Sequence, residues 1–269
     1  MTSDDFEDAP RGVARDSAET IVDRWRALGA RRSERRGSER GFATMRSREV
    51  DSDDGGSARA SAMAIDNVVY EDEVFRKMHC ELAWGDGGFE VLHVVMYPWC
   101  ERATPVFAAD VVSFAGRVTL CIADVAPVRE DLTIPREFMD AIAPARERAC
   151  GGIDGLAPRA LPDWGREILG PLCVCVGPKV GDEGERQVER FLEYLFASHD
   201  AYVAAARDAP LASPSIQQET LRAQTRFCER QLENVKTRRA LERAFGVELA
   251  DRYMREVLFD VTPLTPCSP

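Results

Sequence analysis

Two histidines and a glutamate lie close together in one segment of alternating apolar residues, and such groups can move protons. His79 and Glu81 are two residues apart, and His93 follows in the same segment. Residues i and i+2 of a β-strand point to the same face, so His79 and Glu81 share a face if this segment is extended. A carboxylic acid in apolar surroundings has a raised pKa and can donate a proton near neutral pH, where a histidine also titrates. The spacing therefore allows a buried set of proton donors.

Short strands joined by tight turns are the elements that must position these groups. Glycine-bearing stretches at residues 85–88 and 115–116 are hairpin signals between segments rich in apolar residues. Consecutive hairpins form an antiparallel meander, in which each strand lies beside the next. Strands are predicted over residues 62–70, 77–84, 89–97, 106–114, 117–125 and 172–177, with a shorter one at 42–46.

Alternation along the meander decides which side chains face each other. Asp110 lies on the strand after that of His93, and strand pairing can bring both to the face that carries His79 and Glu81. Cys80, between His79 and Glu81, must point to the opposite face. A single histidine on a strand is more often a core or surface residue, so the residues alone leave a structural and a catalytic interpretation open.

Amphipathic helical patterns precede and follow the strands. Residues 17–30 are predicted to form a helix, with Ser17 or Asp16 as its N-cap and an apolar face made by Ile21, Trp25 and Leu28. Further helices are predicted over residues 135–148, 183–207, 215–245 and 248–258. Strands followed by helices predict the α+β class, with one antiparallel sheet covered by helices.

Composition places the chain among proteins that can bury a sizeable core. The 269 residues are 45% hydrophobic, and the net charge is −11. This charge argues against nucleic acid and anionic membranes as partners, and no apolar run reaches the roughly 18 residues of a membrane span. Eight cysteines occur without a CxxC motif, which indicates reduced thiols, Cys173 and Cys175 included, and a reducing compartment. The acidic N-terminus is unlike a secretory signal.

Motifs of several other enzyme classes are missing from the sequence. There is no GxGxxG that follows a strand, no GxxxxGK(S/T), no HExxH and no GxSxG. The two histidines with Glu81 and Asp110 could instead bind a non-haem metal. A basic helical segment at residues 234–243 could be a solvated face, or it could hold carboxylates or an acidic protein. Its cations are Lys236, Arg238, Arg239 and Arg243.

Six stretches of the chain, taken in order, resemble one enzyme family. They are FRKMHCELA, EVLHVVMYP, PVFAADVV, IADVAPV, ALPDWG and ENVKTRRALERAFGVELADRYMREVLFD, within residues 62–261. Together they resemble the ferredoxin-dependent bilin reductases. This resemblance implies a three-layer α/β/α sandwich with a central antiparallel sheet, formed by residues 61–263. Outside the matched part, the polar composition predicts a mostly polar, partly disordered extension at residues 1–60, with one amphipathic helix, and a tail at residues 264–269.

The resemblance implies stepwise reduction of biliverdin IXα, a linear tetrapyrrole. Single electrons come from reduced 2Fe–2S ferredoxin, the enzyme binds no metal or flavin of its own, and the intermediates are bilin radicals. In the phycocyanobilin-forming branch of the family the D-ring vinyl group is reduced before the A-ring, by four electrons in all. The task that remains for the protein is to deliver protons at the right place and time.

The same motifs imply roles for individual residues. Asp110 corresponds to the aspartate that protonates the bilin, His93 to the histidine that cooperates with it, and His79 to the hydrogen-bonded partner of that histidine. Glu81 corresponds to the glutamate at the D-ring vinyl group, and its presence with His93 points to the phycocyanobilin branch. Asn234 fits this branch too, because the other branches often carry an aspartate there.

Further residues are expected to hold the pigment and the electron donor. Arg159 and Lys236 correspond to basic residues that bind the propionates, and Thr119 to a small hydroxyl residue beside the bilin. Val235 departs from the family motif, which usually has aspartate there, and its effect stays open. Ferredoxins are strongly acidic, so Arg238 and Arg239, with Lys236, are candidates for the docking surface.

Several alternatives stay open at this point. The product could be phycoerythrobilin or phytochromobilin, or the chain could carry a bilin without reducing it, although the retained proton donors favour an enzyme. Ferredoxin supply implies a plastid stroma or a cyanobacterial cytoplasm, and the Arg/Ser-rich residues 31–41 favour the plastid. The family suggests a monomer.

Overall fold

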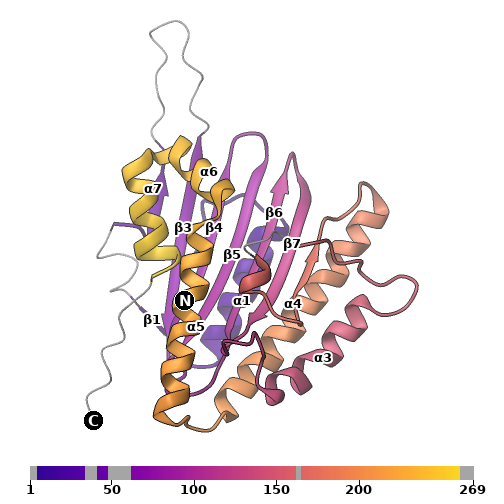
Figure 1. The fold of residues 1–269 in the computed structure, drawn as a ribbon. Coiled ribbons are helices and arrows are strands. Elements are labelled where there is room, and N and C mark those ends of the chain that lie inside the picture. Colours follow the sequence, from indigo (N-terminus) through magenta and orange to yellow (C-terminus); the bar gives the residue numbers. More distant parts are fainter. Residues whose placement is uncertain (1–4, 34–40, 48–61, 162–164, 261–269) are drawn as a thin grey trace, which may run out of the picture.

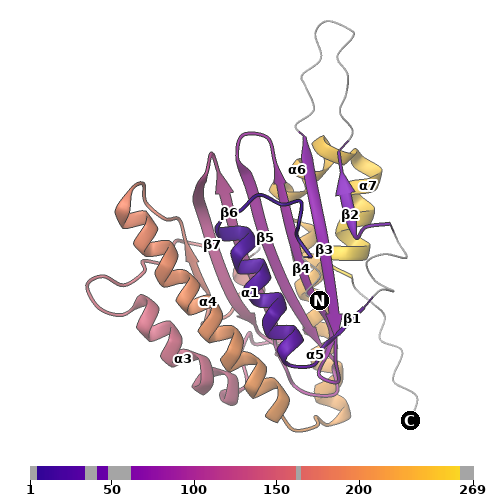
Figure 2. The same cartoon turned by 180° about the vertical axis from the view of Figure 1, so that it is seen from behind.

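A computed structural model describes residues 5–33, 41–47, 62–161 and 165–260, and these form three layers (Figures 1 and 2). The middle layer is one antiparallel sheet in the order β1-β3-β4-β5-β6-β7-β8, with β2 also paired to β3. Helices α5, α6 and α7 cover the face seen in Figure 1, and α1, α3 and α4 cover the face seen in Figure 2. The predicted central antiparallel sheet between helical layers is confirmed.

The elements have the following bounds. The strands are β1 (Arg31–Arg32), β2 (Thr44–Arg46), β3 (Met63–Glu71), β4 (Phe75–Gly85), β5 (Phe89–Pro98), β6 (Val106–Phe114), β7 (Arg117–Ala126) and β8 (Val174–Val176). The helices are α1 (Val13–Ala27), α3 (Arg136–Cys150), α4 (Asp182–Asp208), α5 (Pro214–Leu232), α6 (Val235–Phe245) and α7 (Val247–Tyr253), with a 3₁₀ turn η1 (Gly165–Glu167) and a π-helical turn η2 (Met254–Leu258). None of the described helices is both long and apolar enough to cross a membrane. Much of the predicted extension, at 1–4, 34–40 and 48–60, and the predicted tail at 264–269 lie outside the described residues.

The two predicted hairpin turns meet at one end of the sheet. Gly87 and Gly88, between β4 and β5, have φ of 73° and 67°, a region that favours glycine. The Ala115 N–H, in the turn between β6 and β7, donates to the Gly87 carbonyl at 3.0 Å. A Cβ atom on Gly88 would lie 2.9 Å from the Gly116 nitrogen. The turns therefore pack against each other, which fixes the neighbouring strands in register.

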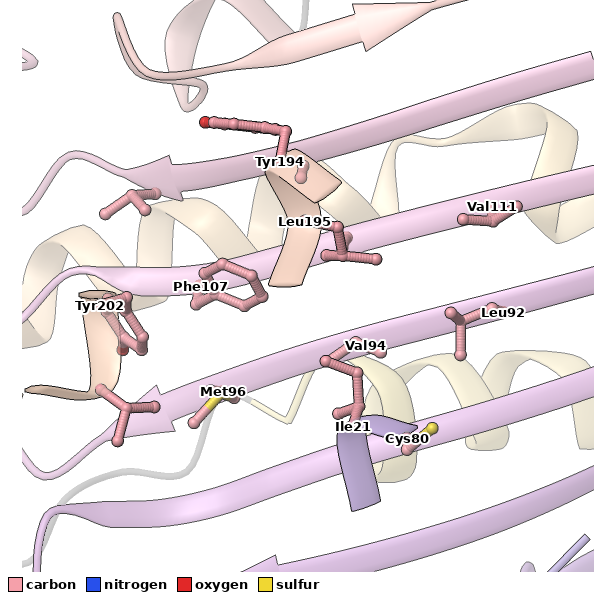
Figure 3. Packing of buried hydrophobic residues seen from close by; sticks show 14 of the residues in the cluster. Ile21, Cys80, Leu92, Val94, Met96, Phe107, Val111, Tyr194, Leu195 and Tyr202 are labelled. Carbon is pink, nitrogen blue, oxygen red and sulfur yellow. The ribbon is translucent and has the colours of Figure 1, made fainter. Parts of the chain in front are cut away.

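One face of the sheet forms the larger apolar core with α1 and α4. Side chains at alternate positions of the central strands point to these helices, and Figure 3 shows Cys80, Val94 and Phe107 among them, with Ile21 from α1 and Tyr202 from α4. The prediction that Cys80 faces away from His79 and Glu81 is confirmed by this packing. The opposite face is therefore the one that carries the polar groups.

Helix α1 begins a turn earlier than the sequence predicts. It starts at Val13, and the first helical hydrogen bond runs from the Asp16 N–H to the Gly12 carbonyl at 2.9 Å. Ser17 is buried inside the helix and caps nothing, and Leu28 lies beyond its end. The early start has a physical reason, because the preceding turn extends the apolar face that packs on the sheet.

The predicted helix over residues 215–245 is in fact two helices. The first ends at Leu232 with Glu233 as its C-cap, and Asn234 is the N-cap of the second. The Asn234 Oδ1 accepts hydrogen bonds from the Lys236 and Thr237 N–H groups at 3.2 and 3.4 Å. Asparagine is a strong N-cap, which explains the break after Leu232. Two smaller differences are a shorter last strand, with Cys173 before it, and strand β1 where a loop is predicted.

Asp124 gives a testable pH dependence of stability. It lies buried on β7, and both carboxylate oxygens accept a hydrogen bond from the Gly170 N–H at 3.1 Å. Burial raises the pKa of Asp124 from 3.8 to about 7, although backbone hydrogen bonds oppose this rise. The folded chain therefore holds the proton more tightly than the unfolded chain does. The stability that results is fully present below pH 3.8 and is lost as the pH rises through about 7.

We expect Asp124→Asn to remove this dependence, because asparagine stays neutral. The free energy of unfolding of the wild-type protein should fall relative to that of the variant by up to roughly 4 kcal/mol between about pH 4 and pH 8. Urea unfolding at a series of pH values measures the difference. Asp140→Asn, at an exposed position on α3, is the matched control and should leave the wild-type slope unchanged. Parallel curves for the wild type and Asp124→Asn would show that the carboxyl group is not responsible.

Candidate active site

A line of directly paired polar residues crosses the sheet on the face beneath α5, α6 and α7. Asn67 on β3 pairs with Glu81 on β4, Glu81 pairs with His93 on β5, and His93 pairs with Asp110 on β6. His79 lies two residues before Glu81 and therefore shares its face. Directly paired residues on antiparallel strands have Cβ atoms about 4.5–5.5 Å apart. The structure thus brings together the four residues His79, Glu81, His93 and Asp110, here called the proton cluster.

Two short hydrogen bonds orient the histidines. His93 Nδ1 lies 2.6 Å from Asp110 Oδ1, and His79 Nε2 lies 2.8 Å from Asn67 Oδ1. The hydrogen bond between the two histidines that the family resemblance implies is not formed, because the ring centroids are 6.2 Å apart. Within the described residues, His79 Nδ1 and His93 Nε2 are buried and make no hydrogen bond. Each ring is thus held through one nitrogen only.

Tyr253 and Asn67 complete this arrangement. The Tyr253 hydroxyl lies 2.7 Å from Asn67 Oδ1 and 2.7 Å from Glu81 Oε2. Asn67 Nδ2 donates to the Phe42 carbonyl at 2.7 Å, which turns Oδ1 toward Tyr253 and His79. A hydroxyl has one proton, so Tyr253 can donate to a charged Glu81, or accept from a neutral one while it donates to Asn67. The hydroxyl therefore suits both protonation states of Glu81.

The environment gives the members of the proton cluster different protonation preferences. Burial raises the pKa of Glu81, which favours the neutral acid. Burial, together with the charges of Lys77 and His93, lowers the pKa of His79 well below 6.5. Burial alone would lower the pKa of His93, but the adjacent Asp110 raises it above 6.5 overall. Neighbouring groups with opposite preferences are typical of sites that transfer protons.

An open apolar surface surrounds the outer end of the proton cluster. The Asp110 side chain is 37% exposed, whereas Glu81 and both histidines are buried. Seven apolar residues on the same sheet face as Asp110 are half-buried or exposed, namely Phe89, Val91, Ala108, Val112, Phe114, Leu120 and Ile122. We call these seven residues the apolar platform. A flat, largely apolar ligand that lies on the platform would meet the Asp110 carboxylate.

The remaining sequence-predicted residues lie outside the proton cluster. Asn234 caps α6 with its side chain, and Lys236 is exposed in the first turn of that helix. Thr119 Oγ1 donates to the Val112 carbonyl at 3.1 Å, beside the platform. Arg159 is exposed, and its N–H donates to the Cys175 carbonyl at 2.7 Å. No hydrogen bond or ion pair within the described ranges joins these four residues to the proton cluster.

Arg159 nevertheless lies at the far end of the same line of paired residues. Asp110 pairs with Ile122, Ile122 pairs with Cys175, and Arg159 is bonded to the Cys175 backbone. Asp110 and Arg159 both act on the pKa of the Cys175 thiol, with opposite signs, although burial is the main cause of its rise. The platform thus surrounds a carboxylate, and Arg159 lies beyond its β7 edge.

Sequence reasoning missed Asn67, Tyr253 and Lys77. Asn67 and Lys77 carry a signal, since each is a polar residue whose place in the strand alternation puts it on the face of the proton cluster. Tyr253 carries none, because it comes from a helix far along the chain. Among the described residues, no three His, Cys, Asp or Glu side chains are arranged to hold a metal ion.

Comparisons with known proteins show the family of the chain. The family model of the ferredoxin-dependent bilin reductases matches residues 39–260. Phycocyanobilin:ferredoxin oxidoreductase of Trichodesmium erythraeum is 34% identical over 208 residues, which cover 76% of this chain and 80% of the relative. The enzyme of the same name from a Synechococcus species is 36% identical over 207 residues, with 77% and 79% covered.

A solved structure shares the fold. Phytochromobilin synthase from tomato, in complex with biliverdin, superposes with a TM-score of 0.59 at 15% identity, covering 88% of this chain and 83% of that one. At this identity the likeness concerns the fold alone, whereas the family match spans most of the chain. The chain therefore belongs to the family of ferredoxin-dependent bilin reductases and is an oxidoreductase.

Proposed function

We propose that this oxidoreductase reduces biliverdin IXα to phycocyanobilin with four electrons from reduced 2Fe–2S ferredoxin. The observation that carries the proposal is the line from Glu81 through His93 to Asp110, which ends at the apolar platform. The platform suits a flat tetrapyrrole, and the line suits the delivery of protons to it. Both cyanobacterial relatives carry the name of this activity, and the tomato relative is in complex with biliverdin.

The chemistry requires a proton for each electron. Each single electron from ferredoxin would leave a bilin radical with added negative charge, and a proton would restore neutrality. Asp110 is the exposed member of the proton cluster and would meet the pyrrole rings, while His93 behind it would supply the proton through their 2.6 Å contact. Four protons in all, one of them from Glu81 and the others from Asp110, would balance the four electrons.

Glu81 is assigned to the D-ring vinyl group. Burial favours its neutral form, and Tyr253 holds its carboxyl group. A neutral carboxylic acid can donate a proton to the vinyl carbon as the D-ring is reduced. His79, held neutral next to Asn67, would relay protons within the cluster rather than store one.

Basic residues would hold the rest of the pigment and the donor. Arg159 lies beyond the β7 edge of the platform, and it and Lys236 are proposed to bind the propionates, with Thr119 and Asn234 lining the pigment. The exposed cations of α6 are proposed to dock ferredoxin, within a chain that is otherwise acidic. Arg238 is less available for this, because it pairs with Asp251 at 3.0 Å, so Arg239 is the better candidate.

The experiment that tests the proposal is anaerobic incubation with biliverdin and reduced ferredoxin, followed by chromatography of the pigment. We expect phycocyanobilin. Phytochromobilin or phycoerythrobilin would assign the chain to another branch, and unchanged biliverdin after demonstrated binding would identify a carrier.

A charge reversal at Arg239 should raise the KM for ferredoxin. Activity with cyanobacterial and with plastid ferredoxins would distinguish a cytoplasmic from a stromal origin, and sedimentation would test the proposed monomer.

Tyr253→Phe is expected to slow biliverdin reduction by roughly tenfold to a hundredfold, because a buried hydrogen bond to Glu81 is lost. Single-turnover rates measured by absorbance test this. Tyr202→Phe is the matched control, since the Tyr202 hydroxyl donates to the Pro105 carbonyl at 2.7 Å on the other face of the sheet. Equal rates for the two variants would remove Tyr253 from the proton path.

A further inference from the structure

Two buried cations occupy neighbouring positions at the start of β4. Arg76 and Lys77 are 3% and 1% exposed. Adjacent residues of a regular strand point to opposite faces, but the pairing of β4 with β5 shifts in register between Phe75 and Lys77. Both side chains therefore lie over the Tyr97 ring, at 4.6 and 5.4 Å from its centroid. The irregularity places two cations on the face of the proton cluster.

Both cations bind the end of the C-terminal segment Tyr253–Asp260. Lys77 Nζ donates to the Val257 carbonyl and to Asp260 Oδ1, the latter at 2.8 Å. Arg76 donates to Asp260 Oδ2 at 3.2 Å and to the Asp260 carbonyl at 3.4 Å. Arg76 also donates to Gln224 Oε1 of α5 at 3.3 Å. Buried charges that are paired and hydrogen-bonded in this way hold a segment in one place, because removal of one partner leaves an uncompensated charge.

The segment Tyr253–Asp260 contacts the proton cluster from the helical layer that covers this face of the sheet. Its first residue, Tyr253, bonds to Glu81, and the Phe259 ring lies edge-on to the His93 ring at 5.9 Å between centroids. Lys77 donates hydrogen bonds on both sides of Phe259 in the sequence, to Val257 and to Asp260. Burial and the Lys77 charge also lower the pKa of His79. The buried cations are thus linked to all three buried members of the cluster.

We propose that Arg76, Lys77 and Asp260 form a latch that positions Tyr253 and Phe259 against Glu81 and His93 during bilin reduction. The three are positioning residues, because their hydrogen bonds and ring contacts described above are to Tyr97, Gln224 and the C-terminal segment. The inference rests on the proposed function and goes beyond it by assigning a reason for two cations inside the apolar layer. When the latch is opened, the strands keep Glu81 and His93 in place, but their partners from the C-terminal segment are released.

The test uses Asp260→Asn and Lys77→Met in the full chain. We expect both variants to bind biliverdin with a Kd within threefold of wild type and to lose about tenfold to a hundredfold in kcat, as for other groups that act by orientation. Hydrogen exchange measured by mass spectrometry should rise in residues 254–260 and stay unchanged in β5 and β6. Arg15→Met is the matched control, because Arg15 is a buried cation bonded to the Ala9 carbonyl on the other face of the sheet. It should leave kcat and exchange in residues 254–260 unchanged.

The outcomes separate this inference from the proposed function. Wild-type kcat in both variants, or unchanged exchange in residues 254–260, would overturn the latch. If Lys77→Met does not fold, Asp260→Asn decides alone, since it keeps the size of the side chain and removes only the charge. If the wild-type protein binds biliverdin without reducing it, the function is wrong, and the latch is still tested by exchange and by the absorption spectrum of the bound pigment.

Discussion

Asp110→Asn is expected to slow biliverdin reduction by about 100- to 10,000-fold, the usual contribution of a positioned acid or base, without loss of pigment binding. Asp110 is the only member of the proton cluster with a substantially exposed side chain, 37%, and it adjoins the apolar platform. Asparagine cannot carry the proton that the substrate requires. It also removes the negative charge and the hydrogen bond of Asp110, which oppose the effect of burial on His93, so the pKa of His93 should fall.

The measurement is a single-turnover absorbance experiment with biliverdin bound under anaerobic conditions. Glu90→Gln is the matched control, because Glu90 lies on β5 on the opposite face and pairs with Ser113 of β6. The control should reduce biliverdin at the wild-type rate. A rate for Asp110→Asn within about fivefold of wild type would mean that another group protonates the rings.

The sheet half of this site could be predicted from the sequence, for a physical reason. Side-chain alternation has a period of two, and short hairpins fix the register of neighbouring strands. These two rules place His79, Glu81, His93 and Asp110 on one face with no knowledge of the helices. The same rules place Cys80 in the opposite core, as the structure shows.

The helical half could not be predicted in this way. Tyr253 reaches Glu81 across 172 positions of sequence, and only the packing of α7 on the sheet brings them together. A local signal also gives the wrong helix bounds. Asn234 lies inside a sequence pattern that predicts one continuous helix, yet its side chain caps α6, so a new helix begins there. The bulge that turns Arg76 toward Asp260 leaves no trace in an alternating strand pattern. Contacts between layers depend on the whole fold, whereas alternation depends on the strand alone.

Glu81→Gln is expected to change the product rather than abolish reduction. Glutamine has the size of glutamate and can still bond to the Tyr253 hydroxyl, so the cluster should keep its geometry. It has no acidic proton, so reduction of the D-ring vinyl group should fail. Asp110 and His93 remain, so the A-ring should still be reduced. The variant should therefore accumulate a pigment that keeps its vinyl group and has gained two hydrogens relative to biliverdin. The pigment formed by the wild type should have gained four.

Chromatography and mass spectrometry of the extracted pigment distinguish these products. The wild type offers an internal check, because burial raises the pKa of Glu81 and the neutral acid is the active form. As the pH rises through this pKa, Glu81 loses its proton. The wild-type protein should then form more of the pigment that keeps its vinyl group. The Glu81→Gln variant should form that pigment at every pH. Asp110→Asn should instead lose both reductions together. Phycocyanobilin formed by Glu81→Gln at the wild-type rate would show that the D-ring receives its proton from Asp110 and His93, which would make the exposed end of the cluster sufficient for the whole reaction.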